Sequence, residues 1–333
     1  MKKTISIGIL GASEIAFRRF LPALTKDARF HYVGVAYYRE QDAEKVKAFK
    51  EQFGGEVFFG FDSLIHNLDV DAIYVPQPPA LHFQYGKQVL EAGKHLFMEK
   101  PFTTDEAKTK ELIELAKAKD KATIENYMFR FHKQIDRFAE IAHSGLIGQL
   151  DHFEVRFAFP LRQLNDFRYN KALGGGALLD CGGYTIMLSN ILVGGDGQIH
   201  PNQPLFEKEK GFEVDMGGSG TMVSSSAGTR CLFSFGMDNE YACYAKAFGS
   251  KGVLVAPRVL TAPSDFDVKF QTWDQNQATL QQEIEIGIDD SFLKSIDNFY
   301  SAVISSEKRE ENYSRILKQA HFIEAMQSFG GLK

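Results

Sequence analysis

The pattern of apolar and polar positions in the first 126 residues alternates between short apolar runs and longer stretches with helical spacing. Most of the short runs are β-branched or aromatic and several are apolar on both faces, which is typical of strands in a parallel sheet covered by helices. This alternation predicts βαβ units in an open, doubly wound parallel sheet. The predicted strands are Thr4–Leu10, Tyr32–Tyr38, Val57–Phe59, Ala72–Val75, His95–Met98 and Ala122–Asn126, and the predicted helices are Glu14–Leu24, Asp42–Phe53, His82–Glu91 and Thr104–Ala118.

The pattern changes after about residue 150, where apolar and polar residues alternate along longer runs. Such alternation predicts antiparallel strands with one covered face. The chain length of 333 residues fits two domains. We therefore predict an α/β domain over residues 1–126 and an α+β domain with a large, mostly antiparallel open sheet over residues 127–333. In the second domain the predicted strands include Gln149–Phe159, Arg230–Phe235 and Tyr241–Phe248, and the predicted helices are Gly183–Leu192, Asp290–Ser305 and Glu311–Phe329.

The composition excludes several classes of protein. Hydrophobic residues make up 44% of the chain and charged residues 24%, and the formal net charge is −5. This balance gives no general attraction to nucleic acid or anionic lipid, so a small-molecule ligand is the expected partner. No run approaches the roughly 18–20 uncharged residues of a membrane-spanning helix. Three cysteines without a CxxC pair indicate neither a metal site nor a disulfide framework.

The first apolar run, Ile5–Leu10, could be mistaken for the core of a secretory signal because two lysines precede it. However, Arg18 and Arg19 follow it and no A-x-A cleavage site is present. We therefore interpret the run as a buried strand and expect a cytoplasmic protein.

The turn after the first predicted strand fits a dinucleotide-binding fingerprint. Gly11, Ser13 and Ala16 occupy the three fixed positions of G-x-G-x-x-G/A. The tight turn requires Gly11, and the third position needs only a small residue, which Ala16 supplies. Ser13 stands where glycine normally lets the backbone approach a pyrophosphate, and its hydroxyl can instead donate to a phosphate oxygen. The candidate cofactor-binding residues of this turn are Gly11, Ala12, Ser13, Glu14 and Ile15.

The end of the second predicted strand bears on the choice of cofactor. An NAD enzyme usually places Asp or Glu there for the ribose 2′-hydroxyl, whereas an NADP enzyme uses Arg for the 2′-phosphate. The strand ends with Tyr38 and Arg39, and no acidic residue precedes Glu40. Arg39 can pair with the phosphate while Tyr38 stacks on adenine, which favours NADP and leaves NAD as the alternative. The other interpretation of Arg39 is a solvated loop cation.

Two further motifs carry candidate catalytic groups. Lys100 lies in Glu99-Lys100-Pro101, directly after a predicted parallel strand, where open α/β sheets hold their ligands. Its ammonium can stabilise a developing alkoxide, and the alternative is an ordinary loop lysine. Asp180 and Tyr184 follow a glycine-rich run and are four residues apart, so that on a helix they face the same way. A tyrosine hydroxyl near a lysine can donate a proton; the alternative is a packed tyrosine and a helix-starting aspartate.

Together these motifs resemble the Gfo/Idh/MocA oxidoreductases over nearly the whole chain. The segments most similar to the nucleotide-sugar 3-ketoreductases of deoxysugar pathways are Ile15–Leu24, Ser234–Met237 and Tyr184. Many family members have histidine at the position of Tyr184, which makes the cyclitol dehydrogenases a poorer match and leaves the tyrosine-bearing aldose and dihydrodiol branches open. The motifs that carry the family resemblance are Tyr74-Val75-Pro76 through His82, Ala92-Gly93-Lys94-His95 through Glu99-Lys100-Pro101, and Gly174 through Asp180.

The resemblance implies a Rossmann domain that binds NAD(P), with Lys100 and Tyr184 facing the nicotinamide. It also implies a cis Lys100–Pro101 peptide bond, and pairing of the open sheet face of the second domain into homodimers or homotetramers. Arg130, Lys133 and Arg168 are candidates for holding a substrate diphosphate, because guanidinium and ammonium groups pair with phosphate. The alternative for each is an exposed, solvated side chain. The resemblance places Pro76, His82, Glu99 and Pro101 on the cofactor side, and the polar set Asn126, Arg130, His132, Lys133, Asp166 and Arg168 becomes the candidate substrate site.

The first functional hypothesis is an NADPH-dependent reductase of the C3 keto group of a nucleotide-linked deoxysugar. In it Tyr184 supplies the proton and Lys100 stabilises the oxyanion, with Asp180 beside them. The second is an NAD(P)-dependent dehydrogenase of a free sugar or trans-dihydrodiol. The third is an NADP-sensing regulator without activity, which the presence of Lys100 and Tyr184 disfavours. The sequence leaves the sugar, its stereochemistry and the direction of hydride transfer open.

Overall fold

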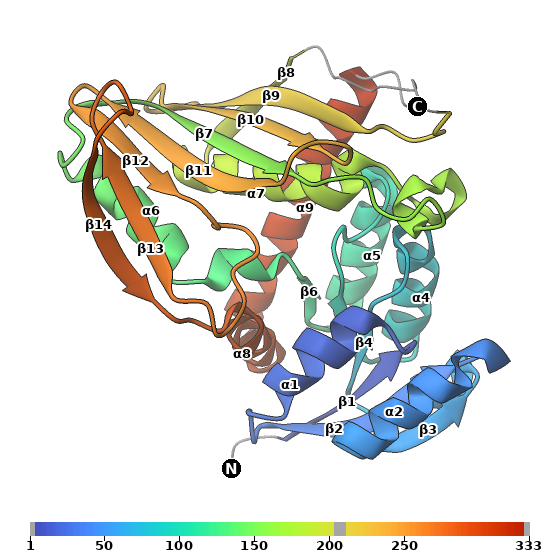
Figure 1. The fold of residues 1–333 in the computed structure, drawn as a ribbon. Coiled ribbons are helices and arrows are strands. Elements are labelled where there is room, and N and C mark those ends of the chain that lie inside the picture. The colour runs from blue at the N-terminus through green and yellow to red at the C-terminus, as the bar shows by residue number, and fades with distance from the viewer. Residues whose placement is uncertain (1–3, 203–210, 330–333) are drawn as a thin grey trace. The chain divides into compact units, whose positions relative to one another are not determined.

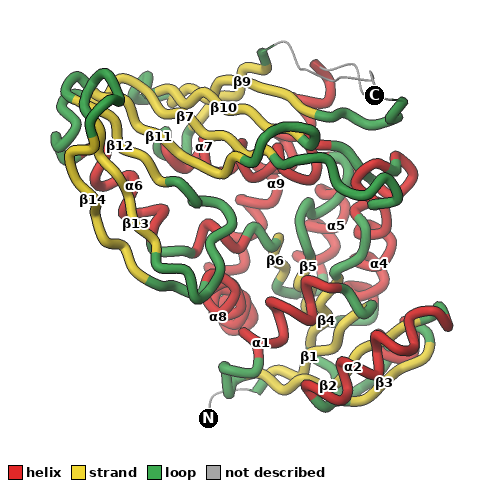
Figure 2. Tube along the Cα trace, in the orientation of Figure 1, coloured by secondary structure: helices red, strands yellow, loops and turns green. Residues whose placement is uncertain are grey.

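The computed structural model describes residues 4–202 and 211–329 and divides into two compact units, which Figures 1 and 2 show as a ribbon and as a tube. The first unit contains the described residues up to Tyr127 together with Phe292–Ala320. The second contains Met128–Ser291 and the described residues from His321 onward. Within the described residues, no helix is long and apolar enough to cross a membrane.

The first unit is built on a parallel sheet of six strands in the order β3-β2-β1-β4-β5-β6. The order reverses between β1 and β4, and open α/β sheets bind their ligands beyond the carboxyl ends of the strands at such a point. These strands confirm the six sequence predictions, with ends that differ by two residues or fewer. Their bounds are β1 Ile5–Leu10, β2 Phe30–Tyr37, β3 Glu56–Phe59, β4 Ala72–Val75, β5 His95–Met98 and β6 Thr123–Glu125.

Helices connect the successive strands of this sheet. The first has a π-helical turn at Ala16–Phe20 that continues into α1 (Leu21–Leu24). A 3-10 turn, Glu40–Asp42, precedes α2 (Ala43–Phe53), and α4 (Pro79–Glu91) and α5 (Glu106–Ala118) follow β4 and β5. The start of α5 is capped, because the Asp105 carboxylate accepts a hydrogen bond from the Lys108 N–H at 2.8 Å.

One short helix, α3 (Phe61–Ile65), is absent from the sequence prediction. Five residues are too few to show a helical period, so no pattern marks it. Burial of Phe61, Leu64 and Ile65 against the sheet holds the segment in place.

The two faces of the parallel sheet have different cores. On one face, Leu96 and Met98 of β5 pack with apolar residues of α3, α4, α5 and α9 (Ser306–Phe329). On the other face, the ring of Phe97 lies 5.1 Å from Phe20 and 5.2 Å from Phe299. The alternation of side chains along a strand places neighbouring residues on opposite faces, which explains why both faces of these strands are apolar.

The helix α8 (Ser291–Ile304) corrects the predicted domain assignment. The predicted second domain includes the whole C-terminal segment, whereas Phe292–Ala320 packs with the first unit. Phe299 completes the aromatic face of the parallel sheet, and Arg29 forms an ion pair with Asp297 at 2.7 Å. Chain order alone does not show which sheet a late helix covers. The other boundary, after Tyr127, lies one residue from the predicted one.

The second unit is built on an eight-stranded sheet in the order β14-β13-β12-β11-β7-β10-β9-β8. All of its neighbouring pairs are antiparallel except β7 and β10, which are parallel. A mostly antiparallel sheet is therefore confirmed. The strands are β7 Leu150–Ala158, β8 Gly197–Pro201, β9 Gly217–Ser224, β10 Arg230–Gly236, β11 Ala242–Gly249, β12 Gly252–Ala256, β13 Val268–Trp273 and β14 Leu280–Gly287.

The sequence pattern predicts β7, β10 and β11 and misses the other strands, among them β9, whose burial comes from its neighbour. β9 begins Gly-Gly-Ser-Gly, a composition that disfavours a strand. The rings of Phe233 and Phe235 on β10 fill the space over Gly220 and Gly218, their cross-strand partners. β14 is mostly exposed, and only Ile284 and Ile286 alternate with polar residues, which is too short a run to mark a covered face.

Two helices, α6 (Gln134–His143) and α7 (Gly183–Leu192), cover one face of this sheet, as Figure 1 shows. The ring of Phe138 on α6 contacts Phe153 of β7 and Phe270 of β13. The bounds of α7 are those predicted, whereas α6 was not expected. The shorter helical turns of this unit are Met128–Phe131, Phe167–Tyr169, Lys171–Leu173 and the π-helical turn Leu178–Gly182.

Candidate functional site

The predicted fingerprint turn lies at the carboxyl end of β1, beside the point where the strand order reverses. Gly11 has a positive φ of 98°, and its N–H donates to the Ala36 carbonyl at 2.8 Å. The side-chain amide of Gln77 passes over this glycine and donates to the Leu10 carbonyl. A Cβ at position 11 would overlap that amide. Glycine is therefore required here by both backbone conformation and space.

Ser13 is oriented by the helix that follows. Its hydroxyl oxygen accepts a hydrogen bond from the Ala16 N–H at 3.2 Å, and this bond uses a lone pair. The hydroxyl proton stays available to an anion. Ala12 and Ile15 are half-buried in the same turn, while Glu14 is exposed and paired with Arg18 at 2.7 Å.

Tyr38 and Arg39 directly follow β2. The ring of Tyr38 is 49% exposed and meets the ring of Phe61 edge-on at 5.1 Å. Arg39 donates from Nε to Asp42 at 2.8 Å, and its guanidinium carbon lies 5.8 Å from the centre of the Tyr38 ring. The structure therefore brings these two residues together at the exposed carboxyl end of β2 and gives Arg39 an acidic partner that the sequence did not predict.

Lys100 follows β5, and the Lys100–Pro101 peptide bond is cis, as predicted. The preceding Glu99 accepts hydrogen bonds from the Tyr74 hydroxyl and the Asn126 amide, both at 2.6 Å. Burial raises the pKa of Glu99, and these two hydrogen bonds oppose the shift. Asn126 in turn accepts from Ser295 at 2.8 Å, so this predicted substrate residue is held inside the first unit.

Two predicted cofactor residues, Pro76 and His82, flank the loop after β4. Pro76 is half-buried, and His82 is fully buried. The Nδ1 atom of His82 lies 2.7 Å from the Pro101 carbonyl oxygen, and its Nε2 atom lies 2.6 Å from the Gln77 carbonyl oxygen. Both ring nitrogens are thus directed at the backbone.

Glu125 lies near Lys100 and was missed by the sequence analysis. Its Oε1 atom accepts the Phe102 N–H at 2.7 Å, and its Oε2 atom is buried without a hydrogen-bond partner among the described residues. Burial raises the pKa of Glu125 to about 8, against the opposing effects of Arg315 and Lys100. Its place at the end of the last parallel strand, directly before Asn126, was the available signal.

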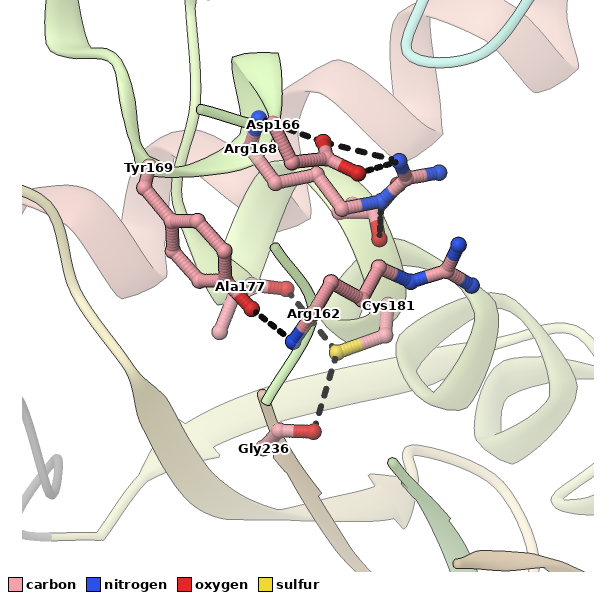
Figure 3. Close-up of polar contacts among 8 residues, drawn as sticks. Arg162, Asp166, Arg168, Tyr169, Ala177, Cys181 and Gly236 are labelled. Atoms are coloured by element: carbon pink, nitrogen blue, oxygen red, sulfur yellow. Dashed lines mark hydrogen bonds and ion pairs between the residues drawn. The ribbon is translucent and has the colours of Figure 1, made fainter. Parts of the chain in front are cut away.

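In the second unit, Asp180 and Arg168 form a partly buried ion pair, and Figure 3 shows Arg168 beside Asp166. Arg168 donates from Nε to Asp180 at 2.7 Å and from NH1 to Asp166 at 3.1 Å. Burial acts to lower the pKa of Arg168, but the charges of Asp180 and Asp166 raise it overall. The sequence analysis named all three residues without predicting that they bind one another.

Tyr184 lies on the first turn of α7 and is 8% exposed. Its ring is 5.5 Å from Phe129 and 5.4 Å from Phe157, and its hydroxyl is 4.0 Å from the Met128 sulfur. Two aromatic neighbours fix the ring, so the direction of the hydroxyl is set by packing.

Asp215 fixes the start of the helical segment that carries Asp180 and Tyr184. Its carboxylate accepts the Leu178 N–H at 2.6 Å, and its backbone carbonyl accepts the Ala177 N–H at 2.9 Å. Gly176 has a φ of 122°, and a Cβ there would overlap the carboxylate. Asp215 is 37 positions from Leu178, so no local pattern revealed it.

The other predicted substrate residues differ in their surroundings. Arg130 stacks on Phe131 at 5.0 Å, and its Nε and NH1 atoms are buried without hydrogen-bond partners among the described residues. Lys133 is exposed, and its backbone N–H donates to Asp289 at 2.7 Å. His132 is buried, with Nδ1 accepting the Gln134 N–H at 3.2 Å.

Two family models match the chain. One, described as "Oxidoreductase family, NAD-binding Rossmann fold", matches residues 5–127. The other, described as the GFO/IDH/MocA C-terminal domain, matches residues 135–255. The two matches correspond to the parallel sheet and to the larger part of the antiparallel sheet.

Individual relatives match over nearly the full length. The chain is 33% identical to the dTDP-3,4-didehydro-2,6-dideoxy-alpha-D-glucose 3-reductase of Actinomadura kijaniata, over 97% of this chain and 95% of the relative. The D-xylose 1-dehydrogenase (NADP(+)) 2 of Haloferax volcanii is 25% identical over 92% of this chain and 93% of the relative. The crystal structure of a 3-ketoreductase from Actinomadura kijaniata, in complex with NADP and TDP-benzene, superposes with a TM-score of 0.87 at 32% identity, covering 98% of each chain.

Proposed function

Because the chain belongs to the Gfo/Idh/MocA oxidoreductase family, we propose that it is an NADPH-dependent reductase of the C3 keto group of a dTDP-linked deoxysugar. The observation that carries this proposal is the 33% identity, over 97% of this chain, with a relative named as a dTDP-sugar 3-reductase. The NADP-dependent D-xylose dehydrogenase, which represents the second hypothesis, is 25% identical.

The residues of the first unit fit a dinucleotide. Gly11 leaves the turn after β1 without a side chain, and the Ser13 hydroxyl has a proton to donate to a phosphate oxygen. Tyr38 and Arg39 offer a ring face and a cation where the adenosine end of the dinucleotide is expected. Arg39 supports NADP, because a guanidinium pairs with a 2′-phosphate and gains little from a 2′-hydroxyl.

When bound, the reduced nicotinamide supplies the hydride. In this proposal the Lys100 ammonium stabilises the negative charge that develops on the carbonyl oxygen, and the Tyr184 hydroxyl donates the proton to that oxygen. Asp180 acts through Arg168, because the two side chains already form an ion pair. Glu99 keeps Asn126 and Tyr74 in place beside Lys100.

The diphosphate of the substrate requires cationic donors. Arg130 is the best candidate, because two of its nitrogen atoms are buried with no hydrogen-bond partner among the described residues, and a buried guanidinium in that state is suited to an anion. Lys133 offers a second, exposed cation. Arg168 keeps its NH2 group for a ligand, since its other donor groups bind Asp180 and Asp166.

We also propose a cytoplasmic homodimer or homotetramer that forms through the face of the eight-stranded sheet opposite α6 and α7. Leu232 on that face is 39% exposed, and Glu154 and Arg156 lie beside it across the β7–β10 pair. The mass of the protein in solution, measured by light scattering, decides between monomer, dimer and tetramer.

The proposed substrate class is tested by thermal denaturation with NADP⁺ and a panel of nucleoside diphosphates. A ligand that binds only the folded state raises the melting temperature. We expect TDP to raise it more than UDP or ADP, and a dTDP-linked 3-keto sugar to oxidise NADPH. Stabilisation by free aldoses, together with no response to any nucleoside diphosphate, would instead establish the sugar dehydrogenase.

A further inference from the structure

His82 connects three loops that lie at the carboxyl ends of neighbouring strands. It lies on α4 and is fully buried. Its Nδ1 atom is 2.7 Å from the carbonyl oxygen of Pro101, in the loop after β5, and its Nε2 atom is 2.6 Å from the carbonyl oxygen of Gln77, in the loop after β4. The histidine therefore contacts the residue next to Lys100 and the segment next to Pro76.

The contact with Gln77 extends to the fingerprint turn. The side-chain amide of Gln77 donates to the Leu10 carbonyl and lies where a Cβ of Gly11 would be. The three loops that follow β1, β4 and β5 are thus joined through one imidazole and one amide. These are the loops at which an open α/β sheet with this strand order holds its ligand.

His82 is unsuited to proton transfer. Burial, with a smaller effect of the nearby Lys100 charge, lowers its pKa to about 4 against the opposing effect of the backbone hydrogen bonds. The neutral ring donates its one N–H to one of the two carbonyl oxygens and has its other nitrogen against the second, so both nitrogens are occupied inside the unit. The geometry leaves a positional role.

We propose that His82 is a positioning residue with two separable effects: the contact with Pro101 directs Lys100, and the contact with Gln77 holds the Gly11 turn that receives the cofactor. The part that concerns Lys100 rests on the proposed function, in which Lys100 stabilises the oxyanion. The part that concerns the turn requires only that the chain bind NADPH.

Two substitutions separate these contacts, because an asparagine amide reaches the place of Nδ1 and a glutamine amide reaches the place of Nε2. His82→Gln keeps the contact with the Gln77 carbonyl and loses the contact with the Pro101 carbonyl. We expect its kcat to fall about tenfold or more, since small displacements of a catalytic group are costly, while its dissociation constant for NADPH stays within twofold. His82→Asn keeps the contact with the Pro101 carbonyl and loses the contact with the Gln77 carbonyl. We therefore expect its NADPH affinity to fall severalfold and its kcat at saturating NADPH to stay within threefold.

The matched control is His95→Asn. His95 is a buried histidine at the start of β5, and its Nδ1 accepts the Ala122 N–H at 2.9 Å, away from the three loops. We expect a lower melting temperature but unchanged kcat and NADPH affinity. If the two His82 variants change kcat and NADPH affinity by equal factors, or change neither, the proposal is wrong.

A second arm distinguishes failure of this inference from failure of the proposed function. In a Lys100→Ala background, adding His82→Gln should lower kcat no further, because its effect passes through Lys100. A full additional loss would overturn the positioning of Lys100. If Lys100→Ala itself leaves kcat unchanged, the assignment of Lys100 fails, whereas the NADPH titration of His82→Asn still tests the Gln77 contact without any sugar substrate.

Discussion

The two units hold their candidate catalytic residues by different physical means. Lys100 lies in a loop, and its neighbour Pro101 contacts the uncharged imidazole of His82. Tyr184 lies on a helical segment, and the carboxylate of Asp215 fixes the start of that segment. The ring of Tyr184 is packed against Phe129 and Phe157. The loop of Lys100 is thus held through a contact with a distant side chain, whereas Tyr184 is held by a helix cap and by ring packing. We therefore expect the two units to respond differently to mutation and to pH.

The largest expected effects come from the two candidate catalytic groups themselves. Tyr184→Phe removes only the hydroxyl, so kcat should fall by about 10²–10⁴-fold with little change in NADPH affinity. Lys100→Ala should cost as much or more, and the two effects should combine non-additively. Single-turnover kinetics with NADPH measure the hydride step directly. A Tyr184→Phe enzyme with the hydride rate and pH profile of the wild type would remove the tyrosine from the mechanism.

The cap of the helix that carries Tyr184 can be compared with an equivalent cap in the first unit. Asp215→Ala and Asp105→Ala each remove a carboxylate that accepts a backbone N–H at a helix start. Each should lower the free energy of unfolding by about 1–2 kcal/mol. Only Asp215→Ala should also lower kcat, by about tenfold, because only that helix carries Tyr184. Denaturant unfolding and steady-state kinetics measure the two effects, and equal kcat losses would show that Asp215 has no special link to catalysis.

Stability should depend on pH with opposite signs in the two units. Burial raises the pKa of Asp215 to about 6, above its usual 3.8, so its contribution to stability is lost as pH rises through this interval. Burial lowers the pKa of His82 to about 4, below its usual 6.5, so its contribution is lost as pH falls through that interval. Melting curves between pH 4 and 8 test both signs. Relative to the wild type, the melting temperature of Asp215→Asn should increase as pH rises, and that of His82→Gln should increase as pH falls. Parallel curves would contradict both shifts.

The smallest expected effect is at the exposed edge of the first unit. Arg39→Ala breaks an exposed ion pair with Asp42, which contributes at most about 1 kcal/mol, so the melting temperature should hardly change. Affinity for NADPH should fall while affinity for NADH stays the same. Titration of both cofactors measures this selectivity, and a tenfold preference of the wild type for NADH would reverse the assignment.

The sequence predicted the first sheet well because burial on both faces leaves compact, mostly apolar runs in central strands such as β4 and β5. It also placed Lys100 after β5 and predicted the bounds of α7. The second sheet was harder to predict, since β9 is buried by the phenylalanines of β10 and not by its own side chains. The role of Phe292–Ala320 was missed because the helices pack on a sheet formed far earlier in the chain.

The candidate site shows the same limit. Sequence motifs and the family resemblance named Lys100, Asp180, Arg168 and Tyr184 as candidates, but their partners depend on contacts between distant segments. Asp215 and Leu178 are 37 positions apart, and Arg168 and Asp180 were assigned separate roles although they form one ion pair. Pairings of this kind are set by the tertiary fold, which local patterns do not encode.

Phe235 on β10 constrains how this protein can evolve. A Cβ at Gly218 would lie 2.7 Å from the ring of Phe235, and one at Gly182, on the turn before α7, would lie 3.0 Å from it. A larger residue at either glycine becomes acceptable only after position 235 has become smaller, and that first step leaves a cavity. Mutations at these three positions are therefore epistatic, and their order of appearance matters. Directed evolution near Tyr184 should sample them together, because one-at-a-time libraries would discard the intermediates.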